Sequence, residues 1–247
     1  ECRRQLTGDE CKAVADVVMS HCRFEVDWSS VPDDAVRIVA TKAAEIKVME
    51  EFLIHRDTRS YIAVDEVQNG TAWEKAGNMI TKRLNRSCYE YDVLKLYANA
   101  IVRMTYNRRQ EGVIPFSQGQ LAVVVRLPDD GASFNEQRIR LRIAAPGVRH
   151  IDTANIPAEW PEIGVGPRTT PAIIVGKYLQ MGRRTQFPVR YYLCTTIHRI
   201  QGETLGLAAT EMSVSKKEYR MWQKEQFAVL ISRVQNCHDL IFVGSPS

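Results

Sequence analysis

Several features that would assign a protein class at once are missing from this sequence. No apolar run approaches the roughly 20 residues needed to span a bilayer, and no secretory signal is present. The chain has six cysteines but no C-x-x-C pair, and the spacing of Cys2, Cys11 and Cys22 matches no usual zinc pattern. We therefore expect reduced thiols, no metal site and no membrane partner in an intracellular protein, in a compartment that the sequence does not specify.

A phosphate-binding loop is also missing, because no G-x-x-x-x-G-K-[ST] occurs anywhere in the chain. Val64-Asp65-Glu66 resembles the end of a Walker B strand, whose carboxylate binds magnesium, but that chemistry also needs the phosphate loop and its lysine. We interpret Asp65 and Glu66 as surface carboxylates at a strand end, and we expect that the chain alone does not hydrolyse ATP. Because it starts at Glu1 rather than Met, we expect a fragment of a longer protein.

The composition bounds the size and the partners of the protein. Its 247 residues are enough for one large domain or two small ones, and 45% of them are hydrophobic. The net charge of +4 permits a nucleic-acid partner without requiring one. Short arginine clusters suit either phosphate contacts or ordinary solvated faces: Arg3-Arg4, Arg83 with Arg86, Arg103 with Arg108-Arg109, Arg138-Arg140-Arg142 and Arg183-Arg184.

The first third of the chain alternates between helix and strand patterns. Thr7 and Glu10 form a capping box before a helix. Residues 35–40 predict a strand rich in β-branched side chains, and Thr41 can cap the helix that follows. The expected buried face of that helix holds Ile46, Met49 and Leu53.

The same alternation continues beyond this helix. Residues 61–64 predict a second strand. Thr71 and Glu74 form another capping box, which predicts a helix ending near Asn85. Strands that alternate with helices indicate an α/β domain.

Residues 94–189 have a different pattern, with short apolar runs separated by Gly, Pro and Asp. Residues 138–143 alternate strictly between arginine and apolar side chains, which predicts a strand with one solvated, basic face. Short strands joined by turns indicate a small β-barrel. The α/β pattern then returns, with strands expected at 189–194, near 205–209 and at 239–243, and a helix near 215–232. The simplest interpretation is a β-rich insertion within an α/β domain.

Two segments near the C-terminus carry a family resemblance. They are Thr195-Thr196-Ile197-His198-Arg199-Ile200-Gln201-Gly202-Glu203-Thr204-Leu205 and Gln226-Phe227-Ala228-Val229-Leu230-Ile231-Ser232-Arg233-Val234. In this order they resemble motifs V and VI of superfamily 1B DNA helicases, and the petite-integration-frequency and RecD-like enzymes are the most similar. Residues 37–45 resemble motif IV, and residues 96–125 resemble the start of the SH3-like 2B domain of these helicases. The resemblance spans most of the chain, but it is loose between residues 110 and 185.

The resemblance implies a fold. It implies a RecA-like (P-loop NTPase-like) helicase domain 2A formed by residues 1–92 and 189–247, with a small SH3-like β-barrel, domain 2B, inserted as residues 93–188. The sequence departs from the family pattern at Gln118-Gly119, Arg199-Ile200 and Leu230-Ile231. These departures are typical of a divergent branch, such as a viral or mobile-element helicase.

The resemblance also implies a nucleotide site that is shared with another domain. In such helicases ATP and Mg²⁺ are bound mainly by a first RecA-like domain, 1A, which this chain lacks. Arg233 then corresponds to the arginine finger that stabilises charge on the transferred phosphoryl group, with Gln226 beside it. Gly202, Glu203 and Thr204 are expected on the ATP side. An arginine at a helix end, favoured by the helix dipole, is the alternative interpretation of Arg233.

Nucleic-acid contacts are expected in both parts of the chain. By motif position, Thr41, Lys42, Thr196, His198 and Gln201 are candidates to bind the phosphates of single-stranded DNA. Helix capping alone would also explain Thr41. In the inserted domain the candidates are Arg103, Tyr106, Arg108 and Arg109, with Arg183 and Arg184 near the return to the core. Tyr106 is equally consistent with core or strand-edge packing.

The resemblance therefore implies the C-terminal motor domain of an ATP-dependent DNA helicase. Its expected partners are single-stranded DNA or a DNA fork and the missing domain 1A, its expected polarity is 5′ to 3′, and its expected roles are DNA replication, repair or recombination. Two alternatives stay open: a non-catalytic nucleic-acid-binding module derived from a helicase, and a viral superfamily 1 RNA helicase domain. The oligomeric state is not predicted.

Overall fold

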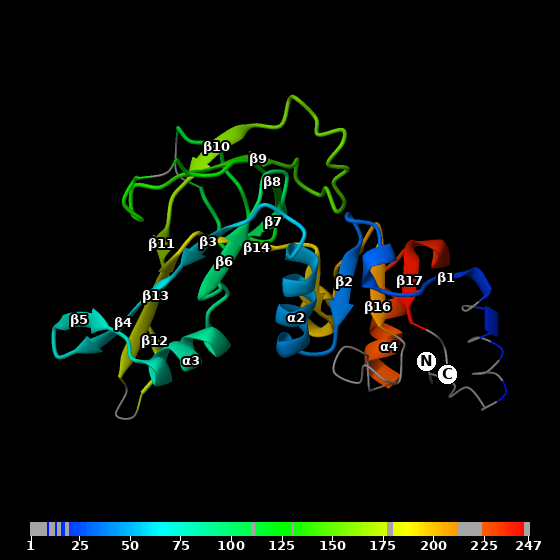
Figure 1. Cartoon of the computed structure of the whole chain (residues 1–247), viewed down its shortest axis with the longest axis horizontal. Coiled ribbons are helices and arrows are strands. Elements are labelled where there is room, and N and C mark those ends of the chain that lie inside the picture. The colour runs from blue at the N-terminus through cyan, green and yellow to red at the C-terminus, as the bar shows by residue number, and fades with distance from the viewer. Residues whose placement is uncertain are drawn as a thin grey trace. The chain divides into compact units, whose positions relative to one another are not determined.

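The chain divides into two compact units, which we describe separately (Figure 1). Unit 1 comprises Glu1–Phe52 and Leu193–Ser247, and unit 2 comprises Leu53–Tyr192, so that unit 2 is an insertion in unit 1. The structure is a computed structural model, and it describes residues 9, 13, 16–17, 20–109, 112–129, 131–176, 180–211 and 224–244.

The first boundary of the insertion differs from the one that the sequence indicates. The sequence predicts that residues 53–92 belong to the α/β domain, but they pack within unit 2. Strand pairing explains the difference. Strand β3 (Arg59–Ile62) pairs with β6 (Val93–Leu96), and β4 (Val64–Asn69) pairs with β13 (Met181–Gln186). Both ladders join residues 53–92 to the rest of the β-rich part.

A parallel β-sheet forms the centre of unit 1. Its strand order is β1-β17-β16-β2-β15, and all of these pairings are parallel (Figure 1). Every residue of β2, β16 and β17 is buried, as expected for a parallel sheet that is covered on both faces. The strands are β1 (Arg23–Glu25), β2 (Val36–Val39), β15 (Cys194–Thr196), β16 (Ala208–Glu211) and β17 (Leu240–Val243).

Helix α2 (Lys42–Leu53) follows β2 directly. The predicted cap is confirmed, because the Oγ1 of Thr41 accepts a hydrogen bond of 3.1 Å from the backbone N–H of Ala44. The predicted buried face is wrong at Ile46, which is 45% exposed. The apolar stripe is shifted by one or two positions, so that the buried apolar residues of the helix are Ala44, Val48, Met49 and Leu53.

The remaining helices of unit 1 are short. Helix α4 (Lys224–Ile231) lies where the sequence predicts a helix at 215–232, although residues 212–223 lie outside the described part of the chain. The predicted N-terminal capping box of Thr7 and Glu10 also lies outside it. None of the described helices is long and apolar enough to cross a bilayer. The described part of the unit also contains the 3₁₀ turns η1 (Trp28–Ser30), η3 (Ile197–Ile200) and η4 (Cys237–Asp239).

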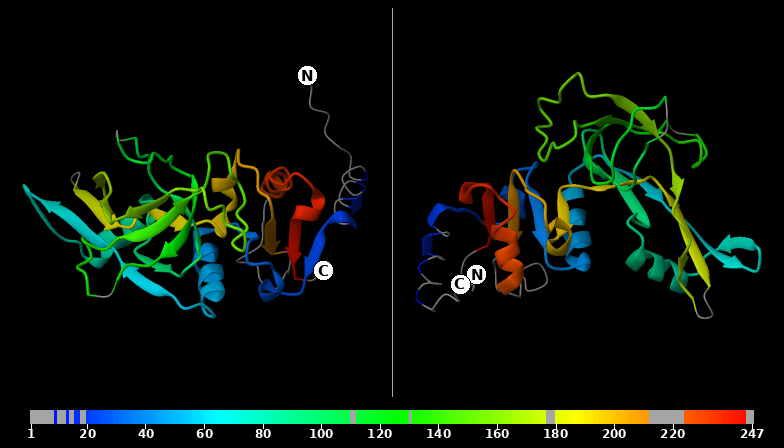
Figure 2. Two further views of the ribbon diagram at one scale, coloured as in Figure 1. Left: turned by 90° about the horizontal axis from the view of Figure 1, so that it is seen from above. Right: turned by 180° about the vertical axis from the view of Figure 1, so that it is seen from behind.

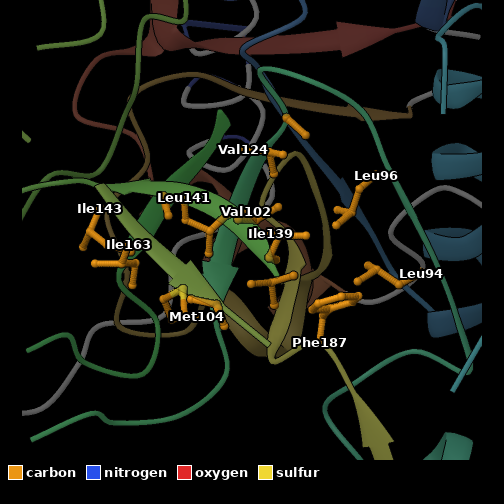
Figure 3. Close-up of a cluster of buried hydrophobic side chains, with 14 of the residues drawn as sticks. Leu94, Leu96, Val102, Met104, Val124, Ile139, Leu141, Ile143, Ile163 and Phe187 are labelled. Atoms are coloured by element: carbon orange, nitrogen blue, oxygen red, sulfur yellow. The ribbon is translucent and has the colours of Figure 1, made fainter. Parts of the chain in front are cut away.

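Unit 2 contains an antiparallel sheet with the order β10-β9-β8-β7-β14. The predicted alternation is confirmed in β9, where Ile139, Leu141 and Ile143 are buried while Arg140 is exposed. Figure 3 shows these apolar side chains gathered with Phe187 in the core of the unit. The strands are β7 (Ile101–Met104), β8 (Leu121–Arg126), β9 (Ile139–Ile143), β10 (Glu162–Val165) and β14 (Val189–Tyr191).

The helix predicted to end near Asn85 is present, but its predicted start at Thr71 is wrong, because residues 64–75 form the hairpin β4–β5, which extends from unit 2 in Figure 2. Asn69 pairs with Ala72 across the loop, and Gly70 has a φ of +60°. A glycine with positive φ at the first position of such a loop suits a type II′ hairpin turn. The helix of this region, α3 (Asn78–Ser87), begins only after Gly77.

The other described strands of unit 2 lie outside this sheet. They build the sheet β11-β13-β4-β5, with β12 paired to β13, and the ladder β3–β6. The strands not yet bounded are β5 (Ala72–Lys75), β11 (Arg168–Thr169) and β12 (Ile173–Ile174).

Asp65 is not a surface carboxylate, contrary to the sequence interpretation. It is 8% exposed, and it forms two hydrogen bonds of 2.7 Å with Arg184, which is fully buried. The two residues lie opposite each other across β4 and β13, and the next pair in the register, Glu66 and Arg183, forms a second ion pair. Arg184 also donates to the Oδ1 of Asn85 at 2.6 Å, so its guanidinium is bound on several sides.

The described cysteines are free thiols, in agreement with the sequence. Cys88 and Cys194 are buried, and this burial raises the pKa of both thiols. Cys22 and Cys237 are partly exposed. The remaining cysteines, Cys2 and Cys11, lie outside the described residues.

The buried ion pair predicts a large loss of stability in Asp65→Asn. That change leaves the guanidinium of Arg184 buried without its counter-charge, so the free energy of unfolding should fall by about 3 kcal/mol or more. Glu66→Gln is the matched control, because Glu66 and Arg183 are 24% and 31% exposed and should lose only about 0–1 kcal/mol. Urea unfolding measures both variants, and equal losses would contradict the assigned difference in burial.

The cap of α2 predicts a smaller effect in Thr41→Ala. Because the N–H of Ala44 then loses its acceptor, the free energy of unfolding should fall by about 1 kcal/mol. Thr41→Ser keeps a hydroxyl in place and should remain near the wild-type value. Thermal and urea unfolding test the pair, and an alanine variant as stable as the serine variant would exclude the cap as a stabilising contact.

Candidate nucleotide and nucleic-acid site

Motifs IV and V leave the parallel sheet at the same edge. Strands β2 and β15 pair in parallel, with Thr196 opposite Val39. The turn into α2 therefore starts beside the turn into η3. In open α/β sheets ligands bind at this edge, outside the carboxyl ends of the strands. The sheet thus brings the predicted phosphate-binding residues of both motifs to one place.

These candidates differ in how much side chain they expose. His198 and Gln201 are exposed, and Thr41 and Lys42 are partly exposed. Thr196 is only 7% exposed, so its side chain offers little surface for a contact. The Oγ1 of Thr41 serves as the helix cap, which is the structural alternative that the sequence left open. His198 and Gln201 offer exposed polar side chains at this edge, and Lys42 is a partly exposed cation.

An ion pair that the sequence did not predict connects the two motifs. Glu45 in α2 is 1% exposed, and its Oε2 lies 3.2 Å from the Nη1 of Arg199 in η3. The backbone carbonyl of Glu45 also accepts a hydrogen bond of 3.6 Å from the thiol of Cys194. These residues are 154 and 149 positions apart, so only the fold brings them together. The sole signal in the sequence is their opposite charge within motifs IV and V.

Arg233 lies directly on the motif V loop. Its Nη1 donates to the backbone carbonyl of Glu203 at 3.1 Å, and its own carbonyl accepts from the N–H of Leu205 at 2.7 Å. Leu205 and Val234 form an isolated parallel bridge beside this contact. Arg233 as a whole is partly exposed.

Arg233 also binds the end of its own helix. Its Nε donates to the carbonyl of Val229 at 3.2 Å, and its Nη2 donates to the Oγ of Ser232 at 2.8 Å. A cation at a helix C-terminus is favoured by the carbonyls that lack partners there. The structural role that the sequence left as an alternative is therefore present, and it fixes the direction of the side chain.

Gly202 is explained by its backbone conformation. Its φ is +83°, and a Cβ at this position would meet nothing within 4 Å. The glycine is therefore needed for the positive φ of an exposed turn, in which the N–H of Glu203 donates to the carbonyl of Ile200 at 3.0 Å. Close approach of a ligand to the backbone is not required to explain this glycine. Glu203 and Thr204 follow it and are partly exposed.

The α4 residues expected near the nucleotide lie largely inside unit 1. Gln226 is 4% exposed, so its predicted contact with a nucleotide would need a path through the surface of the unit. Leu230 in the same helix is fully buried, and Ile231 is partly exposed. The side chain of Phe227 lies outside the described residues. The role of Gln226 stays a prediction.

Unit 2 holds the other nucleic-acid candidates. Arg109 is exposed, whereas the Cζ of Arg103 lies 5.2 Å from the ring centre of Tyr192 and that of Arg108 lies 5.8 Å from Phe116. Tyr106 packs against the core of the unit.

The two arginines near the return to unit 1 are not free to bind phosphate. Arg184 is buried against Asp65, and Arg183 is paired with Glu66. The prediction that Arg184 contacts nucleic acid is therefore wrong.

Comparison with solved structures finds helicases that share the fold. A Pif1 helicase from Candida albicans matches 98% of this chain and 51% of its own, with a TM-score of 0.63 and 17% identity. A Bacteroides Pif1 bound to ssDNA matches 96% of this chain and 45% of its own, with a TM-score of 0.60 and 20% identity. A Bacteroides Pif1 helicase in complex with ADP-AlF3 and ssDNA matches 96% of this chain and 46% of its own, with a TM-score of 0.59 and 20% identity.

The likeness lies in the fold rather than in the sequence. No protein-family model matches the chain, and no curated protein matches it. The chain spans about half the length of these helicases, between 45% and 51%. Its mixed α/β architecture fits a RecA-like helicase domain, and the resemblance inferred from motifs V and VI is confirmed for the fold. The chain has the fold of about half of a Pif1 helicase.

Proposed function

We propose that this chain is the C-terminal motor domain of an ATP-dependent DNA helicase. The observation that carries the proposal is the contact between Arg233 and the carbonyl of Glu203. It joins motif VI to motif V, and motif V is joined in turn to motif IV by the pairing of β15 with β2. The segments that resemble helicase motifs are thus neighbours in one unit.

The longer helicases that share the fold give the frame for this role. The chain covers between 45% and 51% of them, and its sequence has no phosphate loop. In our proposal a separate RecA-like domain, 1A, supplies that loop, and unit 1 is the facing domain 2A. Unit 2, with its antiparallel sheet, corresponds to an SH3-like domain 2B. This chain alone would be inactive as an ATPase.

Arg233 fits the role of an arginine finger. Its Nη1 and Nε donate hydrogen bonds to the carbonyls of Glu203 and Val229, and these bonds fix the direction of the side chain. A fixed cation beside the transferred phosphoryl group stabilises the charge that develops there without reorganisation. ATP would supply the phosphoryl bond whose cleavage drives movement. In our proposal Mg²⁺ is bound mainly by domain 1A, together with the phosphates of ATP.

The nucleic-acid side of the proposal uses the edge where β2 and β15 end. Lys42 and His198 are accessible cationic or hydrogen-bonding groups, and the N-terminus of α2 favours an anion. These groups would bind phosphates of single-stranded DNA or of a fork, with 5′-to-3′ movement. A solved relative is described with ssDNA, which supports this class of partner. Glu45 and Arg199 would transmit changes between α2 and motif V.

A non-catalytic nucleic-acid-binding module is the second candidate. The missing phosphate loop favours it, because binding alone needs no phosphate cradle. A viral superfamily 1 RNA helicase domain is a variant of the first proposal, in which the bound nucleic acid is RNA instead of DNA. The two candidates differ in one respect that can be measured, namely whether Arg233 matters for ATP turnover.

In the complete protein, Arg233→Ala should reduce ATP turnover by about a thousandfold or more while ATP still binds. Arg233→Lys keeps the charge but not the planar fork, and it should recover only part of the rate. Steady-state ATPase assays and equilibrium binding of a fluorescent ATP analogue separate the two steps. Near-normal turnover in the alanine variant would leave the arginine with its helix-end role only.

Binding of the chain to single-stranded DNA should weaken as salt rises, because phosphate contacts release counterions. Lys42→Ala should reduce the slope of log K against log salt by about one. Lys47→Ala, on the same helix but further from its N-terminus, is the matched control and should leave the slope unchanged. Filter binding over a range of salt concentrations measures these slopes, and affinity that ignores ionic strength would exclude phosphate contacts at this edge.

A further inference from the structure

Unit 2 contains an open cavity of about 490 Å³ that none of the helicase motifs lines. Three segments that are distant in sequence form its walls: residues 87–90, residues 105–107 with Gln118, and residues 168–173. Its volume lies in the range of small-molecule and cofactor sites. The space is sufficient for one base with its sugar and too small for a longer stretch of nucleic acid.

Hydrogen bonds hold the walls of this cavity together. The Oγ1 of Thr105 donates to the Oε1 of Glu90 at 2.7 Å, which joins two of the segments. The buried Arg184 connects the third segment, which contains Thr170, to the first, which contains Glu90. Its backbone N–H donates to the Oγ1 of Thr170 at 3.1 Å, and its Nη1 donates to the carbonyl of Glu90 at 3.0 Å. The cavity is therefore formed before any ligand arrives, which lowers the entropic cost of binding.

One wall offers a flat stacking surface. The Cζ of Arg168 lies 4.4 Å from the ring centre of Tyr106, and the ring of Phe116 meets Tyr106 edge-on at 5.0 Å. Both Arg168 and Tyr106 line the cavity. Guanidinium planes and aromatic rings are the groups on which proteins stack unpaired bases.

The polar groups of the cavity suit the edge of a base. Asn107 and Gln118 each carry an amide that donates and accepts, and Asn107 is positioned by a hydrogen bond of 2.8 Å from the N–H of Gln118 to its Oδ1. Only one guanidinium and one carboxylate, those of Arg168 and Glu90, are among the lining side chains. The cavity thus lacks the concentrated positive charge that a triphosphate requires.

We propose that this cavity binds a single nucleobase on its sugar, stacked on the Arg168 guanidinium that Tyr106 supports, as one nucleotide of a bound strand. The assignment to a strand rests on the proposed function. Arg108 and Arg109 follow Tyr106 by two and three positions, and Arg109 is exposed, so cations occur close to the cavity along the chain. A free nucleoside has the same chemistry and is the other possible source of the base.

The test compares a strand with bases and a strand without them. Fluorescence anisotropy measures the dissociation constants of the full chain for a labelled oligothymidylate and for an abasic strand of equal length. Stacking of one base strengthens binding by about 5- to 100-fold. For the wild-type protein, the ratio of the dissociation constant for the abasic strand to that for oligothymidylate should therefore be about five or more. Tyr106→Ala should lower the ratio about fivefold or more, whereas Tyr106→Phe should retain it.

Two further variants guard against a general loss of structure. Asn107 is exposed, so Asn107→Ala should fold normally and still lower the ratio. Trp73→Ala is the matched control outside the cavity, because Arg183 lies over Trp73 at 4.1 Å in the same arrangement. It should leave the ratio unchanged. Thermal unfolding checks the folding of each variant.

The outcomes separate this inference from the proposed function. An unchanged ratio in folded Tyr106→Ala and Asn107→Ala proteins would overturn the base site, even if Lys42→Ala still weakened both strands equally. Failure of the wild-type chain to bind any strand would overturn the proposed function and the strand assignment together. Binding of free adenosine that Tyr106→Ala abolishes, without a preference between strands, would reassign the cavity to a nucleoside and overturn the strand source.

Discussion

The parallel pairing of β2 with β15 is the constraint on which the candidate site depends. Parallel strands need a crossover, and here the chain passes through the whole of unit 2 before β15 returns to pair with β2. The pairing puts the ends of both strands at one edge of the sheet, where the turns into α2 and η3 begin. The ion pair of Glu45 and Arg199 then connects the elements that follow. Without this ladder, motifs IV and V would be separate surface loops.

Unit 2 is organised around a different interaction, the buried guanidinium of Arg184. It is bound by Asp65 across a strand pair, by Asn85 at the end of α3 and by the carbonyl of Glu90. Replacing a buried ion pair by apolar groups is often neutral for stability, so stability alone does not explain such a residue. Its partners come from the hairpin, the helix and the cavity wall, which suggests that its main effect is to fix how these elements meet.

Local patterns in the sequence predicted much of this fold, and the errors have physical causes. The strands β2, β9 and β17 were evident from apolar runs or strict alternation, and Thr41 was evident as a cap. The hairpin at 64–75 was missed because Thr71 and Glu74 imitate a capping box, although Asn69-Gly70 is a strong turn signal. Asp65 was placed at the surface because its partner Arg184 is 119 residues away. The candidate site also combines features that local patterns predict with features that they do not. Motif positions predicted the residues that meet at Arg233. The ion pair of Glu45 with Arg199 and the cavity of unit 2 were not predicted, because both depend on residues that are distant in sequence.

The insertion of unit 2 has a mechanical consequence. Its two covalent connections, at Phe52–Leu53 and Tyr192–Leu193, lead directly into the C-terminal end of α2 and the start of β15. The covalent chain at these two junctions therefore carries any force applied to unit 2 into α2 and β15. These are the elements that pair or begin at the edge of the sheet where the candidate residues lie.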